Sequence, residues 1–169
     1  MAVTQQIARL SEADLERCSK DVAALDELIS FKLCPAKDHL DLNWAPAVLR
    51  QYFGASKQRP EAELALYLSC NGARLANPDH RDGPEPRDVY SDIACLNSNE
   101  VAQVAANFRL VVWSSLIGWL PRDKAEACKA IKMELVVHPD EVFPAYLRSL
   151  AAFYQEAAER TLCTVMWWD

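Results

Sequence analysis

Two short segments of the chain place an imidazole beside carboxylates, a combination that can support proton transfer or metal binding. In the first, Cys34 is followed by Asp38, His39 and Asp41. A thiol next to an imidazole can act as a nucleophile, and thiol, imidazole and carboxylate groups are all metal ligands. A structural interpretation is simpler, because Cys34 ends an apolar stripe and aspartates ahead of a helix normally cap it.

The second segment is His138-Pro139-Asp140-Glu141, in which neighbouring carboxylates could tune the imidazole as a general base. It also has the form of an ordinary helix start, with proline in the first turn and acids near the positive end of the helix dipole. The alternative function is therefore a small cytosolic hydrolase or transferase that uses Cys34 with His39, or His138 with Asp140.

Residues 77–92 are rich in charge and proline and contain almost nothing apolar to bury. We expect them to form the longest exposed loop, and loops of this length often carry function. The acidic side chains of this segment are Asp79, Asp82, Glu85, Asp88 and Asp92. Their spacing lacks the alternate ligands and closing glutamate of a calcium loop, so we expect a solvated or partner-facing acidic loop, and we take these residues as candidates for binding a protein partner.

Cofactor and metal motifs are missing from the sequence. The 4 glycines form no closely spaced group ahead of a helix, as phosphate-binding and dinucleotide-binding loops require. The 6 cysteines form no Cys-x-x-Cys pair. We expect no cofactor and no metal, and a metal-stabilised structural protein is the weakest interpretation. The first residues do not resemble a signal peptide, so reduced thiols and a cytoplasmic location are expected.

Composition favours one domain over residues 1–169, because this length can bury a sizeable core. The net charge is −6, from 24 acidic and 18 basic residues, and such a field repels nucleic acids and anionic membranes. The most apolar run, residues 110–120, is shorter than the roughly 20 residues that span a bilayer. A protein partner with a basic surface suits this charge best.

Periodicity and capping signals predict about five helices packed on a small mixed sheet, which is an α/β (α+β) fold in a single compact domain. The expected helices begin near residues 11, 22, 46, 98 and 140, and a further one is possible after Pro121. Strict alternation over residues 62–70 predicts a strand, with a helix as the competing interpretation because Glu, Ala and Leu are good helix formers. Strands are also expected at residues 93–96 and 162–168.

The last predicted strand contains Trp167 and Trp168, which must point to opposite faces. An outward-facing tryptophan is a common anchor in protein interfaces, and we take Trp168 as the candidate anchor. A sheet that helices cover on both faces would explain the pair equally well.

Four segments of the chain resemble the YfbM-like bacterial family, whose function is uncharacterised. They are Leu40-Asp41-Leu42-Asn43-Trp44, Leu64-Ala65-Leu66-Tyr67-Leu68, Leu96-Asn97-Ser98-Asn99-Glu100-Val101 and Phe153-Tyr154-Gln155-Glu156-Ala157-Ala158. The family's glycine-rich turn after the first strand is reduced here to Asn71-Gly72, and Val142-Phe143-Pro144 replaces its aspartate-isoleucine-tyrosine-proline-like segment. The resemblance implies an α/β fold and a cytoplasmic setting, and it transfers no catalytic residue.

The sequence therefore predicts a non-catalytic protein-binding module. The specific hypothesis is an immunity protein that neutralises a cognate bacterial toxin by direct binding. Its acidic residues would steer the encounter with a basic toxin surface, and its aromatic side chains would supply affinity.

Overall fold

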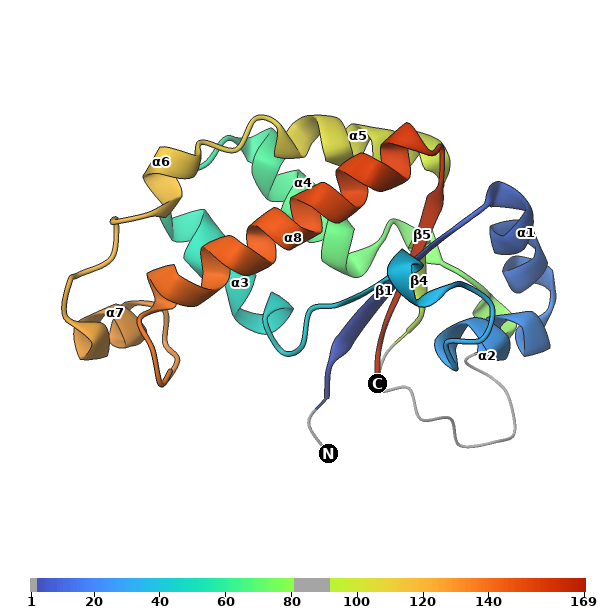
Figure 1. The fold of residues 1–169 in the computed structure, drawn as a ribbon, viewed down its shortest axis with the longest axis horizontal. Coiled ribbons are helices and arrows are strands. Elements are labelled where there is room, and N and C mark those ends of the chain that lie inside the picture. Colours follow the sequence, from blue (N-terminus) through green and yellow to red (C-terminus); the bar gives the residue numbers. More distant parts are fainter. Residues whose placement is uncertain (1–2, 81–91) are drawn as a thin grey trace.

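A single antiparallel sheet organises the computed structural model, which describes residues 3–80 and 92–169 (Figure 1). The first and last strands, β1 (Gln5–Leu10) and β5 (Cys163–Trp168), pair along their whole length in the middle of the sheet. The shorter strands β2 (His39–Asp41), β3 (Arg74–Leu75) and β4 (Ala94–Leu96) complete the order β2-β1-β5-β4-β3. The predicted mixed sheet is wrong, because each pair of neighbouring strands in this part of the chain is antiparallel.

Helices cover both faces of the sheet, so alternate residues of its central strands enter two different cores. On one face, α1 (Glu12–Lys20) and α2 (Val22–Ile29) lie over Ala8, Val165 and Trp167. On the other face, Ile7 and Met166 pack in the core formed with α3, α4, α5 and α8. These helices are α3 (Pro46–Ala55), α4 (Pro60–Asn71), α5 (Ser98–Phe108) and α8 (Pro139–Glu159).

The described residues form eight α-helices rather than about five. The additional helices are α4, which was predicted as a strand, and the two short helices described next. The separate helices predicted near residues 11 and 22 are present as α1 and α2, and the Asp21 side chain between them accepts a hydrogen bond from the backbone of Ala23. Two short helices, α6 (Trp113–Leu116) and α7 (Lys124–Ala130), lie at the far end of the molecule (Figure 1). The short 3-10 turns η1 (Ala36–Asp38) and η2 (Pro78–His80) complete the described elements.

The strand predicted over residues 62–70 is wrong, because this segment is helix α4. Its buried residues follow helical spacing: Ala62, Ala65, Leu66, Ser69 and Cys70. The apparent alternation came partly from Leu64, which is exposed, as is the neighbouring Tyr67. Pro60 in the first turn and Glu61 beside it favour a helix start, so the competing interpretation was correct.

Predictions that rested on capping and long periodicity are confirmed. The Asn97 side chain accepts from the backbone of Glu100, whose carboxylate accepts in return from the Asn97 backbone, which forms the capping box of α5. The last predicted helix is α8, and the terminal strand is β5. In the part of the chain that the structure describes, no helix has the length and apolar character needed to cross a membrane.

A buried ionic cluster joins the sheet to α8. Arg9 of β1 is buried, and its guanidinium donates from Nε to Asp38 at 2.7 Å and from Nη2 to Glu156 at 2.7 Å. Asp38 also accepts two hydrogen bonds from Arg160, at 2.6 and 3.2 Å. Hydrogen bonds from Arg160 and Arg9 hold the pKa of Asp38 at about 2.

Candidate functional site

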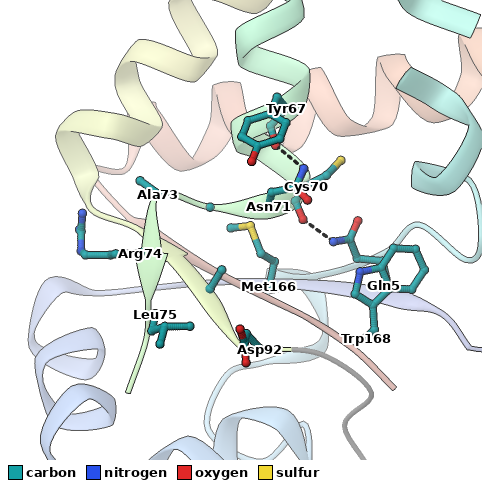
Figure 2. A pocket seen from close by; sticks show the side chains of 12 residues that line it. Gln5, Tyr67, Cys70, Asn71, Ala73, Arg74, Leu75, Asp92, Met166 and Trp168 are labelled. Atoms are coloured by element: carbon teal, nitrogen blue, oxygen red, sulfur yellow. Dashed lines mark hydrogen bonds between the residues drawn. The ribbon is translucent and has the colours of Figure 1, made fainter. Parts of the chain in front are cut away.

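A cleft of about 490 Å³ lies between the C-terminal end of α4 and one end of the sheet (Figure 2). We call it the α4 cleft. Its lining includes Gln5, Tyr67, Cys70, Asn71, Arg74, Leu75, Asp92, Met166 and Trp168. A smaller hollow of about 230 Å³ between α3 and α4 shares Gln5, Tyr67 and Trp168 with it, so the two are continuous.

The cleft exists because α4 stops abruptly above the sheet. Gly72 ends the helix with a φ of 66°, and a Cβ at this position would lie 2.7 Å from the Cβ of Ala94 and 2.9 Å from the backbone nitrogen of Cys95. Only glycine fits this conformation and this close approach. The chain turns directly into β3, which leaves this end of the sheet without a helix over it.

The accessible lining of the α4 cleft is mostly polar, and a few large aromatic and apolar side chains contribute to it. Tyr67 is 43% exposed and Leu75 is 39% exposed. Trp168 is half-buried at the end of β5 and lies directly opposite Gln5 in the pairing of β1 with β5. Figure 2 shows Trp168 and Gln5 together at one end of the cleft, with Tyr67 on the helix above.

Gln5 carries a polar atom that lacks a partner in a buried position. The residue is only 1% exposed, and its Nε2 donates to the backbone carbonyl of Cys70. Its Oε1 has no hydrogen-bond partner among the residues that the structure describes. Leaving a buried acceptor unsatisfied costs about 1–3 kcal/mol, and this oxygen is closed to solvent in the described structure.

Charged side chains of both signs lie at the cleft. Arg74 donates to both carboxylate oxygens of Glu100, at 2.8 and 2.9 Å, so its charge is already compensated. Asp92 contributes a carboxylate to the lining, and it is exposed. Arg50, from α3, lies over the Tyr67 ring at 5.4 Å from the ring centre to Cζ, at the continuation of the cleft.

The structure brings together two of the partner-binding residues predicted from sequence. Asp92 and Trp168 both line the α4 cleft, although they are distant in the chain. Asp79 lies outside the cleft, in η2, where it is exposed. Asp82, Glu85 and Asp88 lie outside the described residues. Sequence reasoning missed Gln5 and Tyr67, because β1 was not predicted and Tyr67 was assigned to a strand.

The first catalytic candidate pair does not have the geometry of an activated thiol. The His39 ring donates from Nε2 to the backbone carbonyl of Cys34 at 3.3 Å, and this hydrogen bond does not involve the thiol. Burial and the nearby Asp14 and Asp38 raise the pKa of the Cys34 thiol to about 11. Burial also lowers the pKa of His39, whose ring packs against Phe31. The thiol is therefore protonated at neutral pH.

The second candidate pair supports the start of α8. His138 caps the helix, because its Nδ1 accepts from the backbone of Asp140 at 3.2 Å while its Nε2 donates to the carbonyl of Pro121 at 2.9 Å. The Asp140 carboxylate accepts from the Tyr52 hydroxyl at 2.8 Å and from the backbone of Gly118 at 3.1 Å. These contacts are structural, and they give no support to the enzyme alternative.

Among the described residues, no group of three or more His, Cys, Asp or Glu side chains is placed to hold a metal ion. Residue 34 precedes η1, and residues 38, 39 and 41 follow along η1 and β2, but Asp38 points into the ionic cluster with Arg9 and Arg160. Its carboxylate is therefore committed to arginine partners. Most of the acidic residues in 77–92 that could be considered as calcium ligands lie outside the described residues.

Comparison with known proteins shows which solved structure has a similar fold. No family model matches the chain, and no curated protein matches it in sequence. Among solved structures, the YfbM protein of Escherichia coli, described as a protein of unknown function, matches with a TM-score of 0.58 at 12% identity. The match covers 98% of this chain and 99% of YfbM. The chain therefore has the YfbM-like fold that its sequence segments predicted.

Proposed function

We propose that this protein is a non-catalytic protein-binding module and that its partner docks in the α4 cleft. The observation that carries the proposal is that three large, partly or fully exposed side chains, Tyr67, Leu75 and Trp168, line one cleft. Aromatic side chains in partly enclosed pockets supply much of the binding energy in protein interfaces. A cleft of this kind is therefore suited to an anchoring side chain of another protein.

The chemistry of the lining favours binding over catalysis. Its thiol, Cys70, is buried, and burial raises the pKa of this group to about 12. The only carboxylate among the described lining residues is Asp92, and no histidine accompanies it there. A nucleophile with a general base, which most hydrolases and transferases need, is thus not assembled in the described part of the cleft.

The charge of the chain favours a basic partner. A net charge of −6 attracts a positively charged protein surface and speeds the encounter. Within this class, we propose an immunity protein that binds and neutralises a cognate bacterial toxin with a basic surface. A protein that blocks a toxin by direct binding needs a stable binding surface but no catalytic activity.

Affinity capture of the tagged protein from its native host, followed by mass spectrometry, tests the proposal. We expect one stoichiometric partner with the wild type and with Trp113→Ala, which removes a half-buried tryptophan outside the cleft. Trp168→Ala should lose that partner, because loss of an interface anchor costs about 2 kcal/mol or more, which is about 30-fold in affinity. Recovery of no partner at low and moderate salt contradicts the proposal.

The immunity hypothesis adds a second readout. If the captured partner is a toxin, its expression should arrest growth, and co-expression of the wild-type chain should restore it. Growth that is not arrested by the partner, or not restored by the chain, contradicts the immunity role while leaving the binding function in place.

A further inference from the structure

We propose that a hollow beside α7 binds an amphipathic carboxylate, such as a fatty acid, at a site separate from the α4 cleft. The hollow has a volume of about 740 Å³ and lies between α7 and the segment that follows it. Its lining consists of eight residues from the continuous stretch 124–135. Stable protein interfaces use about 20–30 residues on each side, whereas a hollow of this volume is typical of a small-molecule site.

The hollow forms because the chain reverses direction after α7 and returns alongside it. Lys132 has a φ of 56°, and the backbone N–H of Met133 donates to the carbonyl of Cys128 at 3.0 Å, which closes the end of the helix. Further along, the carbonyl of Val136 accepts from the Nζ atom of Lys124 at 3.3 Å, at the start of α7. These contacts hold the returning segment against both ends of the helix.

Most of the accessible lining is apolar. Its apolar residues are Ala125, Cys128, Met133 and Leu135. Met133 and Leu135 are half-buried and pack against the main core, so the fold fixes their positions. Val136, which follows Leu135, is 92% exposed, so apolar surface continues beyond the hollow. Covering this surface with the apolar body of a ligand removes it from water, which is favourable.

Three exposed lysines, Lys124, Lys129 and Lys132, surround the apolar part of the lining. Lys124 is engaged with the carbonyl of Val136, but Lys129 and Lys132 form no hydrogen bond or ion pair with any described residue. Glu134 is the acidic residue of the lining, so three lysines and one glutamate give the lining a formal charge of +2. The whole chain, by contrast, carries a net charge of −6.

The other acidic residues of α7 and its cap do not cancel this positive charge. The Asp123 carboxylate accepts from the backbone of Glu126 at 2.9 Å, and neither residue lines the hollow. A cationic ligand would therefore meet like charge, and a neutral apolar ligand would gain from the apolar lining alone. A carboxylate with an apolar body gains from both the lining and the free ammonium groups of Lys129 and Lys132.

Titration of the protein with octanoate, followed through the backbone amide chemical shifts by NMR, tests the inference. We expect saturable shifts that cluster at residues 124–136, with a Kd of about 1 mM or lower. Octan-1-ol keeps the apolar body but forms no ion pair, so it should bind at least about 5-fold more weakly. Octylammonium should cause no saturable shifts in these residues.

Two double variants with the same change of charge show whether the lysines of the hollow are responsible. Lys129→Gln with Lys132→Gln should weaken octanoate binding at least about 5-fold. Lys20→Gln with Lys32→Gln removes two exposed lysines, from the end of α1 and from the segment after α2, which lie at the other end of the molecule (Figure 1). This control should change the Kd less than about 2-fold. Circular dichroism checks that both double variants are folded.

A third variant tests the position of the ligand. Ala125→Phe places a ring in the hollow from an exposed position on α7, so it should block octanoate binding without unfolding the protein. The absence of saturable binding, or shifts confined to other parts of the chain, would overturn the inference. Equal affinity for octan-1-ol, or equal affinity of the wild type and the Lys129 and Lys132 double variant, would overturn it as well.

Discussion

The ionic cluster of Arg9 and Asp38 provides a sharp quantitative test of the structure. Asp38→Asn keeps the size of the side chain but removes the negative charge that faces two guanidinium groups. The carboxylate is 6% exposed and Arg9 is 3% exposed, so the variant leaves a buried cation with less compensation. Breaking a buried pair of this kind typically costs about 3–5 kcal/mol in the free energy of unfolding.

The same cluster predicts a pH dependence. The pKa of Asp38 falls from 3.8 to about 2 on folding, so the carboxylate stabilises the native state above pH 4 and loses this contribution as the pH falls towards 2. The lowered pKa corresponds to about 2 kcal/mol. The difference between wild type and Asp38→Asn should therefore shrink by about 2 kcal/mol between pH 6 and pH 2, because protonated aspartate resembles asparagine.

Urea unfolding, followed by circular dichroism and tryptophan fluorescence at pH 6, 4, 3 and 2, measures this difference. The wild type and Asp38→Asn share all other carboxylates. The effect of acid on those carboxylates therefore cancels in the difference between the two free energies of unfolding. A difference that stays constant over this pH range, or that is below about 1 kcal/mol at pH 6, would refute the assignment of Asp38 as a charged member of the cluster.

Four further substitutions or reactions test other parts of the structure. Gly72→Ala should lower the free energy of unfolding by more than about 1 kcal/mol in urea, because its φ is positive and a Cβ would collide with the backbone of Cys95. His138→Ala should cost about 1 kcal/mol through loss of the α8 cap and should leave partner affinity unchanged by calorimetry. Cys34 should react with iodoacetamide at pH 8 about 100-fold more slowly than a free thiol, since its pKa is about 11. Trp167→Ala should cost about 3–5 kcal/mol in the same urea assay because the side chain is 1% exposed.

Local signals in the sequence predicted the elements whose boundaries are set locally. Asn97 and Glu100 specify the start of α5 by their own hydrogen bonds, and the apolar face of α8 repeats over many turns. The sequence pattern misled at α4, where Leu64 interrupts the helical pattern. That leucine is 46% exposed and lines a hollow of about 430 Å³ with Arg50 and Tyr67. The exposed leucine that disturbs the helical pattern of buried residues therefore lies next to the candidate site.

Strand β1 was missed because its residues carry no alternating pattern. All six are buried, including the polar Gln5, Gln6 and Arg9, since helices cover both faces of the sheet. Polar residues in such a strand are tolerated only through contacts with distant parts of the chain, such as the Asp38 carboxylate for Arg9. Trp168 and Asp92 could be singled out by residue type, but their meeting with Gln5 depends on the pairing of the first strand with the last.

Docking of a partner in the α4 cleft should be visible by hydrogen–deuterium exchange of the chain with and without its captured partner. We expect slower exchange on binding in residues 67–75 and 166–168, with little change in α7 at the far end of the molecule. Protection confined to α7 or to other surfaces, with unchanged exchange around the cleft, would contradict docking at this site.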